Sequence, residues 1–210
     1  MGKFDLLKNF EGLIFDLDGT LVNSMQFHIK AWQEVGEKRG VSIPADYLAE
    51  NGGRPSLLIA GELASRYAFS ESPELLQKEK TENYVRHIPE LFIYPDMLPL
   101  LDFALSSGIS MIIGTGTLRS NVEAVMKHTG LDRYITSFVC SDQVKKHKPH
   151  PDTFLLAAEI MGKSPDRCLV FEDAPLGVEA ARRGGMDCCV VRDGLYDLDR
   201  IIRAGGGDEN

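Results

Sequence analysis

The amino-acid sequence predicts an α/β protein, in which a parallel β-sheet lies between two layers of helices and carries an inserted helical segment. Short apolar stretches alternate with stretches of helical periodicity near the start and over the second half of the chain, a pattern typical of a parallel sheet. Residues 24–90 interrupt this alternation, because they show helical spacing and no strand pattern. Polar and acidic residues follow the apolar stretches, at the sheet edge where such folds bind ligands.

Five apolar stretches are expected to form the strands. The first, residues 12–15, stops abruptly at Asp16-Leu17-Asp18-Gly19-Thr20, so we interpret it as a buried strand that leads into a loop. Prolines and glycines mark several of the helix ends. The other strands are expected at residues 109–113, 138–140, 168–171 and 186–191. Helices are expected at residues 95–108, 151–162 and near 198–202. Two more are expected, one after residue 117 that ends at about His128 and one that begins at Pro175. The tail at 205–210 is expected to fray.

Residues 24–90 are predicted to form a helical cap of their own. Apolar residues recur at helical spacing from Phe27, and again after Pro55 and after Pro73. The expected division is therefore 1–23 and 91–210 for the α/β core domain, and 24–90 for the cap domain.

Composition and charge argue against a nucleic-acid or membrane-surface protein. The 210-residue chain has 43% hydrophobic residues and a net charge of −8, so it can bury a core but lacks the basic surface that these partners attract. We find no apolar run long enough to span a bilayer and no signal peptide. Cys140 and Cys168 have apolar neighbours and are expected to be buried. These features together predict a cytoplasmic protein.

Six polar residues are expected at one edge of the sheet, because they follow predicted strands. Each has an ordinary explanation when it is taken alone. The first two aspartates could form a turn, Thr115 and Asp173 could cap helices, and Lys148 could be an exposed lysine. The six residues are Asp16, Asp18, Thr115, Lys148, Glu172 and Asp173.

Four acids at one rim of the sheet would repel one another and raise one another's pKa values unless a cation joined them. Hard oxygen ligands with few protein donors favour Mg²⁺, which keeps positions for water and a substrate phosphate. We therefore expect Mg²⁺ to be bound by Asp16, Asp18, Glu172 and Asp173, with Asp18 contributing its backbone carbonyl.

The same residues suit phosphoryl transfer. Asp16 beside Mg²⁺ is a competent nucleophile toward phosphorus and would form an aspartyl-phosphate. Lys148, the Thr115 hydroxyl and the Gly116 amide would bind the phosphoryl oxygens. Asp18 would protonate the leaving alkoxide and later accept a proton from the attacking water.

In chain order, these segments resemble the four motifs of the haloacid dehalogenase (HAD) superfamily: Asp16-Leu17-Asp18-Gly19-Thr20-Leu21, Thr115, Lys148-Pro149 and Glu172-Asp173. The first motif is highly specific, and the match covers the whole core. The resemblance implies a Rossmann-like core and a Mg²⁺-dependent phosphohydrolase. Carbon–halogen hydrolysis is not expected, because true haloacid dehalogenases have no acid at the position of Asp18.

The chain also resembles the β-phosphoglucomutase-like branch of that superfamily, which inserts a helical cap after the first motif. This resemblance implies that His28, Arg54 and Lys80 lie near the substrate. The segments at 114–117 and 144–154 resemble fructose-1-phosphate phosphatases, whereas Asn23 stands where the mutase usually has Asp.

Two activities remain open at this stage. The first is a phosphatase acting on a small sugar or polyol phosphate, and the alternative is a β-phosphoglucomutase-type mutase. Arg54 and Lys80 would suit the mutase by binding a second phosphate, but the longer C-terminal match favours the phosphatase. A non-catalytic phosphosugar-binding protein would not need an intact Asp16. His28 is expected either to pack or to assist Asp18, Trp32 is expected to pack in the cap, and the branch is often monomeric, so we expect a monomer.

Overall fold

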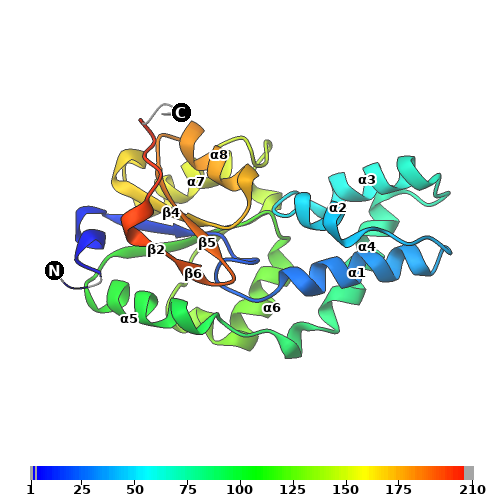
Figure 1. Ribbon diagram of the computed structural model, residues 1–210, viewed down its shortest axis with the longest axis horizontal. Helices are drawn as coiled ribbons and strands as arrows, with labels where there is room; N and C mark the ends of the chain where they lie inside the picture. Colours follow the sequence, from blue (N-terminus) through cyan, green and yellow to red (C-terminus); the bar gives the residue numbers. More distant parts are fainter. Residues whose placement is uncertain (1, 3, 206–210) are drawn as a thin grey trace.

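A computed structural model describes residues 2 and 4–205, and a six-stranded β-sheet lies at the centre of its larger part (Figure 1). The strand order is β3-β2-β1-β4-β5-β6. Neighbouring strands from β3 to β5 are parallel, and β6 is antiparallel to β5. The strands are β1 (Gly12–Phe15), β2 (Ser110–Gly114), β3 (Phe138–Val139), β4 (Cys168–Glu172), β5 (Asp187–Arg192) and β6 (Leu195–Tyr196). The fold is the expected α/β sandwich with one strand reversed at its edge.

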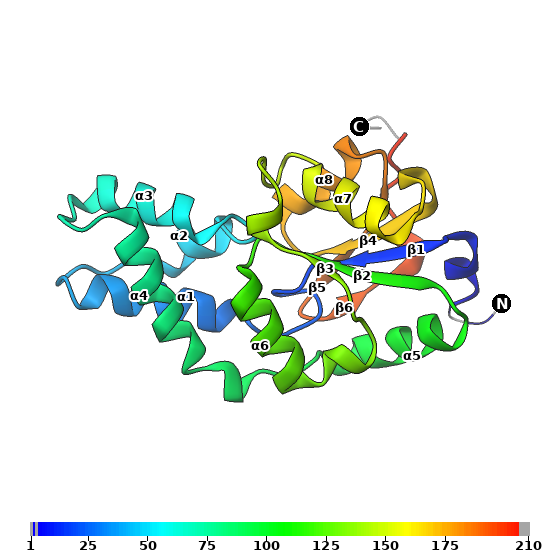
Figure 2. The same cartoon turned by 180° about the vertical axis from the view of Figure 1, so that it is seen from behind.

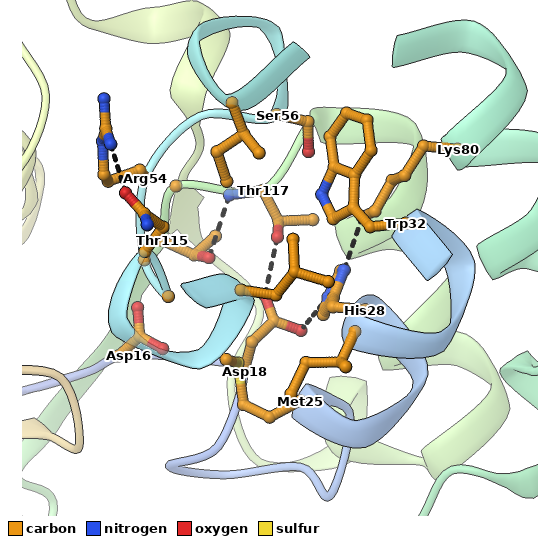
Figure 3. Close-up of a pocket in the computed structure, with 17 residues that line it drawn as sticks. Asp16, Asp18, Met25, His28, Trp32, Arg54, Ser56, Lys80, Thr115 and Thr117 are labelled. Atoms are coloured by element: carbon orange, nitrogen blue, oxygen red, sulfur yellow. Dashed lines mark hydrogen bonds and ion pairs between the residues drawn. The ribbon is translucent and has the colours of Figure 1, made fainter. Parts of the chain in front are cut away.

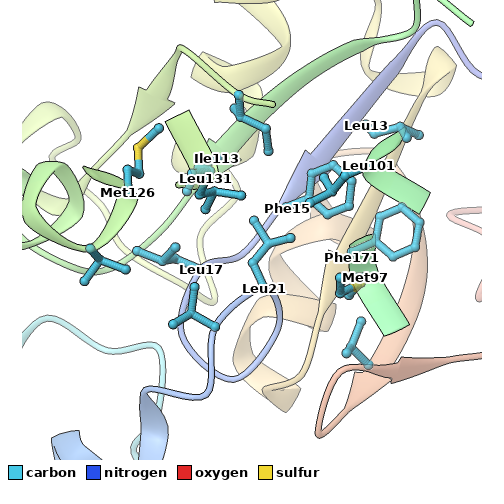
Figure 4. Packing of buried hydrophobic residues seen from close by; sticks show 14 of the residues in the cluster. Leu13, Phe15, Leu17, Leu21, Met97, Leu101, Ile113, Met126, Leu131 and Phe171 are labelled. Atoms are coloured by element: carbon cyan, nitrogen blue, oxygen red, sulfur yellow. The ribbon is translucent and has the colours of Figure 1, made fainter. Parts of the chain in front are cut away.

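Helices cover both faces of the sheet, and the side chains of β1 are buried against helices on each face. Leu13 and Phe15 belong to the apolar cluster under α5 and α6, whereas Ile14 belongs to the cluster under α7 and α8 (Figures 1, 2 and 4). Successive side chains of a strand point to opposite faces, so a strand buried on both faces is apolar throughout. The helices are α5 (Leu98–Ser106), α6 (Arg119–Thr129), α7 (Asp152–Met161) and α8 (Pro175–Arg183).

The chain after β5 differs from the expectation. Asp193 and Gly194 have φ values of +50° and +77°, which suit the tight turn of a β-hairpin, and the chain returns as β6. The short helix predicted near the C-terminus is only a 3₁₀ turn at Leu198–Arg200. Ile202 instead pairs with Cys188 through two backbone hydrogen bonds of 2.8 and 2.9 Å, and this pairing prevents a longer helix.

Residues 24–90 contain four α-helices that lie beside the sheet (Figure 1). They enclose an apolar cluster of their own, which includes Trp32, Ile59, Leu63 and Leu76. Trp32 thus packs in the cap as expected. We keep the name cap for residues 24–90, and the two boundaries stay a prediction. The helices are α1 (Met25–Glu37), α2 (Ala45–Glu50), α3 (Ser56–Tyr67) and α4 (Pro73–Val85).

The two chain segments that join the cap to the core run side by side. The Asn23 side-chain oxygen accepts a hydrogen bond of 2.8 Å from the Phe92 amide, and the Asn23 amide donates to the Phe92 carbonyl at 3.3 Å. Ser24 and Leu91-Phe92 lie at this junction, and we predict that the cap moves relative to the core by rotation there.

Three smaller expectations concern the chain as a whole. All four cysteines are free and buried, as expected for Cys140 and Cys168. Over the described residues, no helix is both long enough and apolar enough to cross a membrane. The tail expected to fray is residues 205–210, of which 206–210 lie outside the described part of the chain.

Candidate active site

The two central strands bring three acids together at their carboxyl ends. Phe15 of β1 is paired with Phe171 of β4, so Asp16 and Glu172 follow at the same level of the sheet, and Asp173 comes next. Each of the three carboxylates has an oxygen within 4.8 Å of the other two. Asp16 is 2% exposed and Glu172 is fully buried. Such a concentration of buried acid needs compensating positive charge.

Lys148 supplies part of that charge. It lies in the loop between β3 and α7, and its Nζ atom is 2.6 Å from both Asp16 Oδ1 and Glu172 Oε2. Burial alone would lower the pKa of Lys148, but the charges of Asp16 and Glu172 raise it above its usual value. Lys148 is therefore a permanent cation beneath Asp16.

One lysine does not balance three carboxylates. Burial, and then the charge of Glu172, raise the pKa of Asp16 to about 8 despite Lys148. Burial, and then Asp16, raise the pKa of Asp173 to about 7, and burial raises the pKa of Glu172 as well. Three negative charges against one positive charge leave a deficit of two. A divalent cation on these oxygen ligands would remove that deficit, so the residues fit a metal site.

Three donors hold the carboxylate of Asp18, and Figure 3 shows two of them, His28 and Thr117. Its Oδ1 accepts hydrogen bonds from Ser24 Oγ at 2.5 Å and from His28 Nε2 at 2.9 Å. Its Oδ2 accepts one from Thr117 Oγ1 at 2.6 Å. Burial alone would raise the pKa of Asp18, but His28, Ser24 and Thr117 hold it below its usual range.

His28 connects Asp18 to Lys80 of α4. Lys80 Nζ is 2.6 Å from His28 Nδ1, and burial lowers the pKa of Lys80 to about 8. Burial and the neighbouring Lys80 lower the pKa of His28, so its ring is neutral. Because an ammonium group can only donate, His28 Nδ1 accepts from Lys80, and His28 Nε2 carries the proton that is donated to Asp18. The ring also stacks on Tyr84, with centroids 4.0 Å apart.

The loop between α2 and α3 brings the cap into contact with the loop after β2, residues 115–117. We call this the phosphate loop, because Thr115 and Gly116 are predicted to bind the phosphate. A side chain at Gly116 would collide with the carbonyl oxygen of Gly53. Arg54 follows at the pocket wall, where its guanidinium donates to Glu62 of α3 and to Asn51. Figure 3 shows Arg54 on the side of the pocket opposite to His28 and Lys80.

The pocket itself lies between cap and core and offers about 50 Å³ of space to the centres of water-sized molecules. Asp16, Asp18, Thr115 and Gly116 line its core side, and Lys148 lies beneath Asp16. The cap contributes the predicted His28, Arg54 and Lys80, together with an apolar wall of Met25, Ile29, Trp32, Leu48 and Ile59.

The structure adds residues that the sequence analysis does not assign to the site. Thr20 donates a hydrogen bond of 3.0 Å to Asp173 Oδ1, and Thr117 and Ser24 donate to Asp18. Thr20 and Thr117 stand inside motifs that were recognised, so their hydroxyls could have been considered. Glu62 gave no signal, because its partner Arg54 is eight residues away across a loop.

The site combines a buried carboxylate, a second acid two residues later and a lysine–acid cluster at the edge of a parallel sheet, and such a combination suits phosphoryl transfer. The chain belongs to the haloacid dehalogenase-like hydrolase family, whose model matches residues 10–185. It is 40% identical to fructose-1-phosphate phosphatase YqaB of Escherichia coli (strain K12), over 89% of this chain and 99% of that protein.

Two further comparisons are informative. The phosphorylated carbohydrates phosphatase of Thermotoga maritima is 30% identical over 93% of this chain and 91% of that protein. The crystal structure of β-phosphoglucomutase from Clostridium difficile matches with a TM-score of 0.78 at 26% identity, over 85% of this chain and 83% of that chain. The fold is therefore that of both phosphatases and mutases within this family.

Proposed function

We propose that this protein is a Mg²⁺-dependent phosphatase that hydrolyses a small phosphorylated sugar or polyol through an aspartyl-phosphate on Asp16. The observation that carries the proposal is the contrast between Asp16 and Asp18, which line one pocket in opposite environments. Asp16 lies in the acid cluster over Lys148, whereas Asp18 is held by Ser24, Thr117 and His28. The names of the two phosphatase relatives support the substrate class. A cytoplasmic location and a monomeric state stay predictions.

Asp16, Glu172, Asp173 and the backbone carbonyl of Asp18 are the residues that would hold Mg²⁺. When bound, the ion would supply positive charge to the phosphoryl oxygens and to Asp16. Mg²⁺ suits these residues because it prefers a few carboxylates and leaves positions for substrate and water.

Asp16 attacks the phosphorus and forms the aspartyl-phosphate, while the sugar leaves as an alkoxide. The Thr115 hydroxyl, the Gly116 amide and Lys148 stabilise the negative charge on the phosphoryl oxygens. Gly53 of the cap loop contacts Gly116, so closure of the cap also excludes water from this end of the pocket.

Asp18 must give a proton to the leaving alkoxide and later take one from the attacking water. The proton on His28 Nε2 lies on a hydrogen bond of 2.9 Å to Asp18 Oδ1, and Lys80 Nζ lies 2.6 Å from the other ring nitrogen. We infer that a proton moves from Lys80 through His28 to Asp18 as the alcohol leaves. The proton of water returns along the same path, which restores all three groups at the end of the cycle.

The environment of Lys80 favours a phosphatase over the mutase alternative. Lys80 lines the pocket, but it is 2% exposed and its Nζ atom is directed at His28, so in this arrangement it serves Asp18 and not a second phosphate. The 40% identity to a fructose-1-phosphate phosphatase points the same way.

The test is a direct comparison of two reactions with the purified protein and Mg²⁺. Inorganic phosphate released from a panel of sugar phosphates, including fructose 1-phosphate, is measured beside conversion of β-glucose 1-phosphate to glucose 6-phosphate with a bisphosphate primer. We expect steady phosphate release and negligible isomerisation. Efficient isomerisation with little free phosphate would establish the mutase instead.

A further inference from the structure

Arg54 is held at the pocket wall by a network of side chains within the cap. Its two terminal nitrogens lie 3.0 and 2.5 Å from the two carboxylate oxygens of Glu62, which is a bidentate ion pair. Asn51 accepts a further hydrogen bond from Arg54, and the Tyr47 hydroxyl donates to Glu62 at 3.1 Å. We call Tyr47, Asn51, Arg54 and Glu62 the rim network.

The rim network is more than a loose surface ion pair. Isolated surface pairs contribute little, but bidentate arginine–carboxylate geometry within a network is the exception. The Arg54 side chain is only 23% exposed, and the Arg66 guanidinium lies 4.8 Å from the centre of the Tyr47 ring. Arg54 is thus held directly by Glu62 and Asn51, and Tyr47 in turn bonds to Glu62.

Glu62 also determines the charge that the pocket presents beside Arg54. The bond from Arg54, and then that from Tyr47, hold the pKa of Glu62 below its usual value although partial burial opposes them. Glu62 is therefore ionised at neutral pH, and the pair carries no net charge. A second phosphate or a carboxylate of a ligand would have to replace Glu62 at the guanidinium and would meet its negative charge.

We propose that Glu62 is a positioning residue for specificity, which holds Arg54 away from anionic ligand groups and restricts the pocket to singly phosphorylated, otherwise uncharged sugars or polyols. This inference deepens the proposed function and rests on it for the identity of the site. Hydroxyl groups of the ligand need no full charge from Arg54, so the rim network tolerates them. Without Glu62, Arg54 would be released to bind a second anion.

The experiment measures binding, so that it does not depend on turnover. Fructose 1-phosphate and fructose 1,6-bisphosphate share a sugar and differ by one phosphate. Their dissociation constants are measured by calorimetry with Mg²⁺ present, in Asp16→Asn and in Asp16→Asn/Glu62→Gln. We expect Glu62→Gln to improve the bisphosphate-to-monophosphate affinity ratio by about tenfold, because one released charge-assisted interaction is of that size.

Two further variants show whether Glu62 acts through Arg54. Adding Arg54→Gln to the Glu62→Gln protein should return the affinity ratio toward the starting value. Glu74→Gln removes the same charge from an exposed residue of the cap that does not line the pocket, and it should leave the ratio unchanged. A general effect of cap charge would instead move the ratio equally in Glu62→Gln and Glu74→Gln.

The outcomes separate this inference from the proposed function. An unchanged ratio in the Glu62→Gln protein, equal shifts in both glutamine variants, or no measurable binding of either ligand overturns the role of Glu62. Phosphate release by the wild-type chain is measured separately. A chain that releases none but shows the shift in binding overturns the phosphatase and upholds the inference. A chain that releases phosphate but shows no shift in binding upholds the phosphatase and overturns the role of Glu62.

Discussion

At the scale of single residues, the site depends on two aspartates in unlike surroundings. Asp16 lies among Glu172, Asp173 and Lys148, where burial raises its pKa to about 8. Asp18 accepts three hydrogen bonds and has a lowered pKa. Environments that push the pKa values of two nearby acids apart are how proteins assign them different chemical roles. The roles that we propose are nucleophile for Asp16 and proton carrier for Asp18.

Asp16→Asn tests the nucleophile. Asparagine keeps the shape and an oxygen that can accept from Lys148, but it cannot attack phosphorus. We expect turnover to fall by at least about 10³-fold, while thermal unfolding remains cooperative. Asp132→Asn, at an exposed aspartate, is the matched control. Activity above a few per cent of wild type in Asp16→Asn would mean that the nucleophile is elsewhere.

Lys80→Met tests the buried cation that faces His28, Asp18 and Tyr84. The pKa of Lys80 is about 8 in the folded protein, against 10.5 for an unperturbed lysine. Between these values the unfolded chain binds the extra proton, so stability rises with pH. The free energy of unfolding of wild type, relative to Lys80→Met, should therefore rise by at most about 3 kcal/mol from pH 8 to pH 10.5.

Denaturant unfolding at several pH values measures this difference. Lys78→Met, at an exposed lysine of the same helix, controls for the loss of a lysine. If the wild-type curve and the Lys80→Met curve stay parallel across the range, Lys80 does not carry the depressed pKa.

At the scale of elements, the cap loop and the phosphate loop meet at two glycines. Gly116→Ala would place a methyl group against the Gly53 carbonyl. The cap loop could then not approach the phosphate loop as closely as in wild type. We expect kcat/KM to fall by about 10- to 100-fold, since misplacement of about 1 Å can cost that much. Gly61→Ala is the control, because its new methyl group would come no closer than 3.9 Å to Pro73.

The fluorescence of Trp32 provides a second test of the contact between the cap loop and the phosphate loop. It is the single tryptophan of the chain, lies in the cap and lines the pocket. Its fluorescence should change when a phosphate analogue binds to wild type and to Gly61→Ala, and should change less in Gly116→Ala. An equal response in all three proteins would argue against this contact between the cap and the core.

The elements differ in how far the sequence predicts them. The central strands were predicted to within a residue or two, because a strand buried on both faces must be apolar and its end is marked by polar residues. β6 was missed, since two residues give no periodicity. The Asp193-Gly194 pair is the one local signal for the hairpin, because Asp-Gly suits its tight turn. The predicted terminal helix was wrong because Ile202 is held by a strand partner that is distant in sequence.

At the scale of the whole molecule, the site is assembled from core and cap together. Asp16, Lys148 and Glu172 could be placed from the sequence, because strand ends of a parallel sheet share one edge. The contacts of His28 with Lys80 and of Arg54 with Glu62 could not, because they depend on how cap helices pack. The sequence could name the two cap cations but not their partners, and the partners decide what the cations do.

The last prediction concerns the charge deficit of the acid cluster and the stability of the whole fold. An ion that binds only the folded chain stabilises it by about 2.7 kcal/mol at 100 times its dissociation constant. For a chain of this size, Mg²⁺ should then raise the Tm of the chelated protein by roughly 5–10 °C. EDTA should abolish activity and Mg²⁺ restore it, with Ca²⁺ a poor substitute because its looser coordination misplaces the nucleophile.

Asp173→Asn should change its melting order relative to wild type between EDTA and Mg²⁺. Asparagine keeps the oxygen that accepts from Thr20 and removes one buried charge from the cluster, so in EDTA the variant should melt no lower than wild type. In Mg²⁺ the order should reverse, because the variant has lost a metal ligand. Asp132→Asn should follow wild type in both conditions. Equal melting shifts in wild type and Asp173→Asn, or full activity after exhaustive chelation, would remove the metal from this site.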